Sequence, residues 1–191
     1  MDTVRAFVAV LLTEEIRARL AAEVERLRAP TRDVAWVDRD NVHLTLKFLG
    51  GVEAARLDAV AAALGAAVAR RAAFHLVLQG LGAYPSAGRP RVLWAGVGEG
   101  AAAMSDLAGR VDAALAPLGF PRELRPFAAH ATLGRVRVSR ADRGLGEALA
   151  SGGVFGGQQV AHVSLMRSDL SPRGARYTEL ASLPLASDPA G

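Results

Sequence analysis

Two His-x-Thr triplets, His43-Leu44-Thr45 and His130-Ala131-Thr132, are the residues of this sequence best suited to catalysis. Histidine has an ordinary pKa of about 6.5, so near neutral pH one member of a pair can accept a proton while the other donates one. Neighbouring hydroxyl groups can hold the non-bridging oxygens of a phosphate. The combination predicts in-line displacement at phosphorus, with His43 and His130 as acid and base and Thr45 and Thr132 as phosphate ligands. The triplets alone do not say which histidine has which role.

Other kinds of site fit the sequence less well. A catalytic zinc ion usually needs three protein ligands, and neither triplet contains a carboxylate. The sequence has no cysteine, which excludes thiolate zinc sites and cysteine nucleophiles. It also lacks the glycine motifs of serine hydrolases, P-loop enzymes and dinucleotide-binding proteins. We therefore expect no metal ion and no cofactor, and the remaining alternative is that both histidines are structural.

The first triplet belongs to a segment that predicts a half-buried strand. Residues 42–48 alternate strictly between apolar and polar side chains, so His43, Thr45 and Lys47 are expected on one face and Phe48 on the apolar face. Lys47, the only lysine of the chain, is therefore a further candidate for binding phosphate.

The second triplet is followed by Arg135, which is a secondary candidate. Strict alternation would place Arg135 on the face opposite His130, so its participation requires a β-bulge at Gly134.

An internal repeat relates the two triplets. A single offset of 87 residues superimposes them and also pairs Phe7 with Trp94 and His75 with His162, so that all four histidines of the chain match without a gap. The second histidine pair lacks the threonine, and we interpret it as structural. The matching positions predict two copies of one structural unit.

Hydrophobic periodicity predicts the elements that position the triplets. Each copy is expected to contain a strand, a helix, the His-x-Thr strand, a second helix and a further strand. The expected strands include 4–12, 42–48, 74–78, 92–97 and 160–166, and the expected helices are 14–28 with Thr13 as N-cap, 57–68, 104–118 and 141–150. This pattern predicts an α+β protein.

The chain length predicts one domain. A chain of 191 residues with 51% hydrophobic residues can bury one ordinary core. We assign residues 1–184 to a single bilobal domain of two repeats, about 4–87 and 91–174, and residues 185–191 to a loose C-terminal tail.

Composition says less about partners than about compartment. No apolar stretch approaches the roughly 18–20 residues that span a bilayer, and the N-terminus lacks the pattern of a signal peptide, so we expect a cytoplasmic protein without membrane association. The net charge is only +4, which is weak support for a nucleic-acid partner.

Longer blocks around the triplets extend the pattern. They read RAFVA (5–9), NVHLTLKFLG (41–50), GLGAYPSAGRPRVLWAGV (80–97), RPFAAHATLGR (125–135) and SLMRSDLSPRGARYTEL (164–180). In this order they resemble the two-histidine (2H) phosphoesterases, specifically the RNA 2′,3′-cyclic phosphodiesterases, also called 2′-5′ RNA ligases. One departure is Tyr84, where the family is expected to have phenylalanine.

The resemblance implies a LigT-like fold: a pseudo-twofold, duplicated domain with antiparallel sheets facing a central cleft and helices outside. It also implies hydrolysis of an RNA terminal 2′,3′-cyclic phosphate to a 2′-phosphomonoester without a cofactor, and 2′-5′ ligation in reverse. His43 would be the proton donor and His130 the proton acceptor, while Thr45 and Thr132 would bind the phosphate.

The implied partners are RNA ends that carry a 2′,3′-cyclic phosphate, tRNA fragments among them, and we expect a monomer. Lys47, Arg135 and Tyr84 are secondary candidates for substrate binding, and Arg167 and Arg176 are weaker ones. Two alternatives stay open: a phosphodiesterase for small cyclic phosphates, such as a cyclic nucleotide or ADP-ribose cyclic phosphate, and a non-catalytic RNA- or nucleotide-binding module.

Overall fold

The computed structural model describes residues 2–29, 33–138, 143–172 and 174–187. Its strands are β1 (Thr3–Leu11), β2 (Val34–Trp36), β3 (His43–Glu53), β4 (Phe74–Tyr84), β5 (Val92–Val97), β6 (His130–Val136), β7 (Val154–Val160), β8 (His162–Ser171) and β9 (Gly174–Pro184). Its α-helices are α1 (Glu14–Arg28), α2 (Leu57–Val68), α3 (Ala101–Leu115) and α4 (Arg143–Ala150), and short 3-10 helices cover Arg39–Asn41, Ala54–Arg56 and Ala116–Leu118. The α+β class is as predicted.

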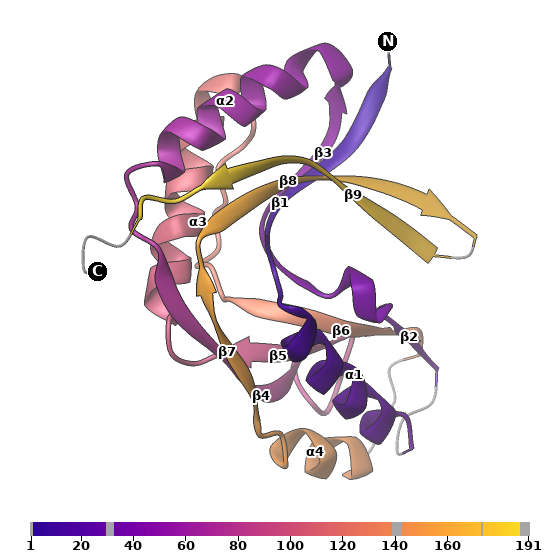
Figure 1. Ribbon diagram of the computed structural model, residues 1–191. Helices are drawn as coiled ribbons and strands as arrows, with labels where there is room; N and C mark the ends of the chain where they lie inside the picture. Colours follow the sequence, from indigo (N-terminus) through magenta and orange to yellow (C-terminus); the bar gives the residue numbers. More distant parts are fainter. Residues whose placement is uncertain (1, 30–32, 139–142, 173, 188–191) are drawn as a thin grey trace.

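The strands form one curled sheet in the order β7-β4-β5-β6-β3-β1-β8-β9, and β2 pairs with β6. Every pairing between these strands is antiparallel. Figure 1 shows two lobes: β1, β3, β8 and β9 lie with α2 and α3, while β2 and β4–β7 lie with α1 and α4. We expected antiparallel sheets facing a central cleft, and the sheets of the two lobes are joined into one through β3 and β6.

Each lobe is built from both halves of the chain. The bounds of α3 are those of α1 shifted by 87 residues, which agrees with the internal repeat. However, α1 follows β1 in sequence but packs on β7 in the other lobe, and α3 follows β5 but packs on β3. The two sequence repeats are therefore intertwined and do not correspond to the two lobes.

The first helix shows how the local sequence produces its element. Ile16, Leu20, Val24 and Leu27 are buried along one face of α1, and the Thr13 side chain accepts a hydrogen bond from the backbone N–H of Ile16. This apolar stripe and N-cap are the features that predicted a helix over 14–28. None of the described helices is long and apolar enough to cross a bilayer.

Two β-bulges at equivalent positions change the faces of the His-x-Thr strands. The register of β3 against β1 skips Leu46, and the register of β6 against β5 skips Leu133. These leucines are 87 residues apart, so the bulge is a repeated feature. Because one extra residue shifts the alternation, the side chains that follow each bulge exchange faces.

The C-terminal segment begins as part of the packed structure. Leu185 is buried, and the N–H of Ala186 donates to the carbonyl of Arg71 while its own carbonyl accepts from Ala73. The predicted loose tail, 185–191, is therefore wrong for its first residues, because an apolar side chain and a backbone pairing hold them. Residues 188–191 lie outside the described part of the chain.

Candidate active site

The two His-x-Thr triplets meet at the join between the lobes. Leu44 of β3 pairs with Ala131 of β6 in antiparallel register, and these two residues are also related by the 87-residue offset. The pseudo-twofold axis therefore runs between the middle residues of the two triplets. In an antiparallel pair, this register places Thr132 across from His43 and His130 across from Thr45, as close cross-strand neighbours.

Both histidine rings are held by the same backbone contact. His43 Nδ1 lies 2.7 Å from the carbonyl oxygen of Asn41, and His130 Nδ1 lies 2.7 Å from that of Ala128. A carbonyl only accepts, so Nδ1–H donates in each case and Nε2 is the nitrogen left for a substrate. His43 Nε2 lies 3.0 Å from Thr45 Oγ1, which links the members of the first triplet.

Aromatic rings enclose each imidazole. Phe7 stacks on His43 with ring centroids 4.8 Å apart, and Tyr177 approaches the same ring edge-on at 5.3 Å. Tyr84 approaches His130 edge-on at 5.3 Å, and Trp94 lies 6.4 Å from it. The offset that pairs Phe7 with Trp94 in sequence therefore pairs two residues with comparable positions beside the histidines.

A cavity of about 330 Å³ opens beside the first triplet. Besides His43, Thr45 and Thr132 it is lined by Arg5, Ala6, Phe7, Val37, Asn41, Phe48, Gly50, Arg135, Ser168, Leu170, Ala175 and Tyr177. Two guanidinium groups, two hydroxyls of the triplets and an imidazole thus converge on one concavity. This set of donors is suited to a phosphate group.

The enclosure of His43 affects its titration. Burial lowers the pKa of His43 from its ordinary value of about 6.5, and the hydrogen bond to the Asn41 carbonyl opposes that shift without cancelling it. The neutral imidazole is therefore favoured by this environment.

The prediction that Lys47 shares a face with His43 is wrong. Its side chain is 2% exposed, and Nζ lies 2.6 Å from Asp112 Oδ1 on α3 and 2.7 Å from the carbonyl oxygen of Pro121. The bulge at Leu46 turns Lys47 to the helix side of the sheet. Lys47 is thus a buried ion-pair residue that does not line the cavity beside His43.

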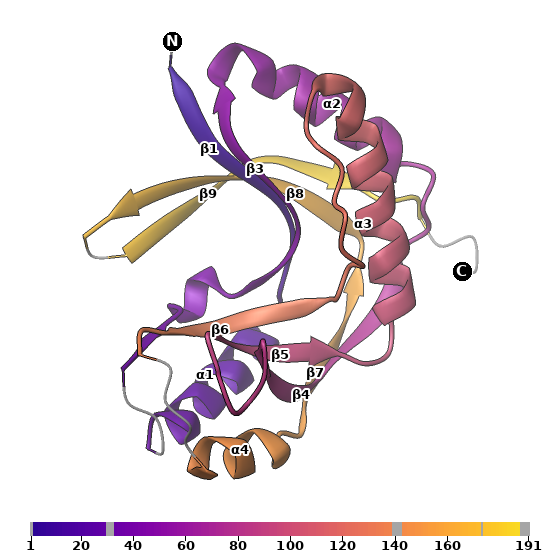
Figure 2. The same ribbon diagram turned by 180° about the vertical axis from the view of Figure 1, so that it is seen from behind.

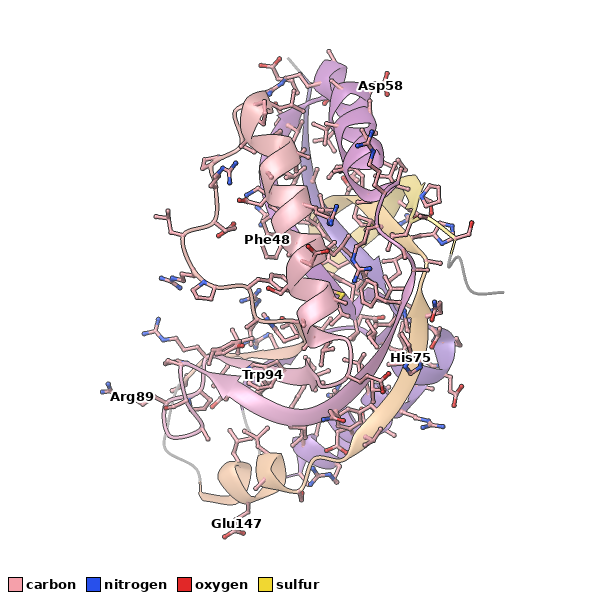
Figure 3. The ribbon with its side chains drawn as sticks, turned by 90° about the vertical axis from the view of Figure 1, so that its left-hand side faces the viewer. Phe48, Asp58, His75, Arg89, Trp94 and Glu147 are labelled. Carbon is pink, nitrogen blue, oxygen red and sulfur yellow. The ribbon has the colours of Figure 1, made fainter. Side chains whose placement is uncertain are left out.

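The same bulge moves Phe48, which the alternation had placed on the apolar face. Its side chain is 63% exposed and lines the cavity with His43 and Thr45. Figure 3 shows Phe48 beside the irregular segment that connects α3 to β6.

The second strand behaves as its sequence suggested, with a small shift. The bulge required to bring Arg135 to the face of Thr132 is present, at Leu133 rather than Gly134, and Arg135 lines the cavity. Phe48 and Arg135 are thus the equivalent residues of the two triplet strands, each five residues after its histidine.

The remaining candidate residues lie outside the cavity. Arg167 is paired with Asp169, and neither Arg167 nor Arg176 lines the cavity. His75 lies near the start of β4, away from Trp94 (Figure 3), and its Nδ1 lies 3.2 Å from the carboxylate of Glu99. Among the described residues, no three histidine, aspartate or glutamate side chains gather as a metal site would require.

Sequence reasoning missed several residues of this site. Phe7 was visible as a partner of Trp94 in the repeat. Arg5, Phe7 and Tyr177 also stand in blocks that resemble the family, but none of them was assigned a role. Arg5 comes from β1, which pairs with β3, and Tyr177 comes from β9, which lies two strands beyond β1 in the sheet. Their contribution depends on pairings between distant strands.

Comparison with known families agrees with this geometry. The family model described as "LigT like Phosphoesterase" matches residues 10–94. The RNA 2′,3′-cyclic phosphodiesterase of Methanothermobacter thermautotrophicus is 33% identical over 179 residues, which are 93% of this chain and 96% of that protein. The protein of the same name from Aquifex aeolicus is 34% identical over 93% of this chain and 95% of its own.

Solved structures show the same fold. A crystal structure of a Thermus thermophilus protein has a TM-score of 0.79 at 34% identity and covers 96% of this chain and 99% of that one. The crystal structure of Escherichia coli LigT complexed with 3′-AMP also has a TM-score of 0.79, at 28% identity, with 96% and 99% coverage.

Proposed function

This chain belongs to the LigT-like phosphoesterases, and on that basis we propose that it hydrolyses the 2′,3′-cyclic phosphate at RNA 3′ ends to a 2′-phosphomonoester. The observation that carries the proposal is the cross-strand pairing of the triplets about Leu44 and Ala131. It brings the two triplets together at a cavity that His43, both threonines and two arginines line, with His130 on the adjoining strand β6. In-line displacement at phosphorus needs this set of acid, base and oxygen ligands.

Each motif residue has a distinct role in the reaction. His130 Nε2 takes a proton from the attacking water, and His43 Nε2 gives a proton to the departing 3′-oxygen, so the 2′-oxygen keeps the phosphate. The hydroxyls of Thr45 and Thr132 donate to the non-bridging oxygens. Nδ1–H of each ring stays bonded to its carbonyl, which keeps Nε2 in the required orientation.

The surroundings of His43 shape its role as donor. Burial lowers the pKa of His43 and so favours its neutral form. A bound cyclic phosphate brings a negative charge beside the ring, which raises that pKa. The substrate itself therefore favours the protonated donor, and Arg5 and Arg135 compensate the remaining phosphate charge.

The same groups can serve a second nucleophile. With a 5′-hydroxyl in place of water, the proton acceptor and donor join a cyclic phosphate to a second RNA as a 2′-5′ linkage, and the 3′-oxygen again leaves. No nucleoside triphosphate enters either reaction, because the cyclic ester carries its own leaving group.

Product analysis tests the proposed function. The protein is incubated in EDTA with an oligoribonucleotide that ends in a 2′,3′-cyclic phosphate, and products are separated against 2′- and 3′-phosphate standards. We expect the 2′-phosphate, formed without a divalent metal. Formation of the 3′-phosphate would overturn the assignment of the leaving oxygen. Activity that disappears with chelator and returns with zinc or magnesium would overturn the two-histidine mechanism.

Matched histidine variants extend this test. His43→Ala and His130→Ala should each lower kcat at least about 10²-fold, the lower limit of what a general acid or base contributes. The controls are His75→Ala and His162→Ala, which remove the other repeat-related pair and should retain wild-type turnover. Near-native turnover in either motif variant would contradict the assignment.

A further inference from the structure

A second cavity adjoins the first where β3 leaves β6. It has a volume of about 450 Å³ and is lined by Lys47, Phe48, Leu49, Phe120, Pro121, Arg122, Glu123, Leu124 and Arg125. One wall is the part of β3 that follows its bulge, and the other is the irregular segment between α3 and β6. Figure 2 shows this segment running back along α3 toward β6. The volume is within the ~300–1,000 Å³ range of small-ligand sites.

The irregular wall is held in place from beneath. Lys47 Nζ donates to the carbonyl of Pro121, and Asp112 Oδ1 accepts from both Lys47 and the backbone N–H of Glu123. Phe120 is buried in the core. The cavity therefore exists before any ligand binds, and the charge of Lys47 is already neutralised.

The rim of the cavity combines cations with exposed apolar groups. Arg122 and Arg125 are exposed, and no carboxylate among the described residues forms an ion pair with either of them. Leu124 is 96% exposed and Phe48 is 63% exposed. Arginines that can contact phosphate beside a ring on which a base can stack are typical of single-stranded nucleic-acid binding.

Phe48 connects this cavity to the proposed catalytic site. Its ring lines both cavities, so a ligand in the second cavity continues directly from one beside His43. An RNA chain that ends in a cyclic phosphate has only one direction in which to continue, toward its 5′ end. The occupant of an adjoining cavity is then the preceding nucleotide.

We propose that the second cavity binds the nucleotide preceding the terminal one. Its base lies against Phe48 and Leu124, and the phosphodiester that joins it to the terminal nucleotide lies near Arg122 and Arg125. The substrate is accordingly an RNA end of at least two nucleotides rather than a free cyclic mononucleotide. This inference rests on the proposed function and adds the substrate class.

The test compares two substrates on purified full-length protein: adenosine 2′,3′-cyclic phosphate and the adenylyl-adenosine dinucleotide with the same cyclic end. Stacking and phosphate contacts at one nucleotide predict that kcat/KM for the dinucleotide is at least about fivefold higher. The Arg122→Ala/Arg125→Ala variant and the Leu124→Ala variant should each reduce this ratio. We expect at least about a fivefold reduction for the double variant.

The control removes two exposed arginines away from the cavity, Arg70 and Arg110, as Arg70→Ala/Arg110→Ala. It carries the same charge change and should keep the wild-type ratio. Far-UV circular dichroism verifies that each variant is folded, which we expect because the substituted side chains are exposed.

The outcomes distinguish failure of the proposed function from failure of the second nucleotide site. Wild-type protein that hydrolyses neither substrate would overturn the proposed function and this inference with it. Equal kcat/KM for the two substrates would leave the proposed function intact and overturn the second nucleotide site. The same follows if a preference for the dinucleotide survives in the Arg122→Ala/Arg125→Ala variant, or falls equally in the control.

Discussion

At the scale of single residues, the two motif histidines have matching backbone contacts but different surroundings. Each donates from Nδ1 to the carbonyl two residues earlier. His43 is also covered by the face of Phe7 and the edge of Tyr177. In the proposed reaction His43 needs the negative charge of the substrate to take up the proton that it donates, because burial lowers its pKa.

Titration of His43 is the prediction at this scale. Because burial lowers its pKa, the His43 ring should change protonation below its ordinary midpoint of about 6.5 in the free protein. Bound 2′-phosphomonoester should raise the midpoint, since its negative charge favours the imidazolium. Histidine ring chemical shifts in an NMR pH titration measure both, with His43→Ala to assign the signal. A midpoint at or above about 6.5 in the free protein would contradict the predicted desolvation.

At the scale of elements, a one-residue bulge decides the function of a whole strand. If β3 alternated regularly, without the bulge at Leu46, Lys47 would lie on the same face as Thr45 and Phe48 would lie in the core. With it, Lys47 ties β3 to α3 through Asp112, and Phe48 faces the two cavities. Lys47 is thus a structural link between β3 and α3.

Substitution of Lys47 tests this link. Lys47→Met removes the cation but leaves the mostly buried Asp112 carboxylate unpaired, so unfolding free energy at neutral pH should fall by about 2–4 kcal/mol. Lys47→Met/Asp112→Leu should recover at least half of the loss, because no unpaired charge remains. Urea denaturation of the three proteins gives these differences. A single variant as stable as the wild type would show that the pair is not a structural link.

At the scale of the whole molecule, the repeats are exchanged between lobes. The lobe that contains β1, β3, β8 and β9 has β1, β3 and α2 from the first repeat but α3 and β8 from the second. Helix α1 is tied to the other lobe by Gln158 of β7, which accepts from the N–H of Thr13 and donates to the carbonyl of Leu11. Neither repeat can therefore bury its own apolar faces.

Cleaving the chain between the repeats tests this arrangement. Fragments 1–87 and 88–191 should each lack a cooperative thermal transition, because each lobe core needs elements of both. Mixed after refolding, they should regain the transition and the cyclic phosphodiesterase activity, since His43 and His130 are then reunited. Circular dichroism melts and the activity assay measure these outcomes. Cooperative unfolding of either fragment alone would contradict the exchange.

The sequence by itself determined the α+β class, most helix positions, the repeat and the two triplets, since these depend on local periodicity and on residue types at short spacing. Two strands escaped it: β2 is only three residues long, and β7 is interrupted by Gly156 and Gly157. Such segments become strands through partners that are distant in sequence.

Only the tertiary structure decided which side chains join the triplets. A bulge inserts one residue without disturbing composition, so the apolar-polar pattern could not show that Lys47 and Phe48 exchange faces, and it permitted Arg135 only conditionally. The exchange of helices between lobes, and the approach of Tyr177 to His43, depend on packing between segments that are distant in sequence. The local sequence pattern determines the chemical groups of the site, and long-range strand pairing determines which side chains surround them.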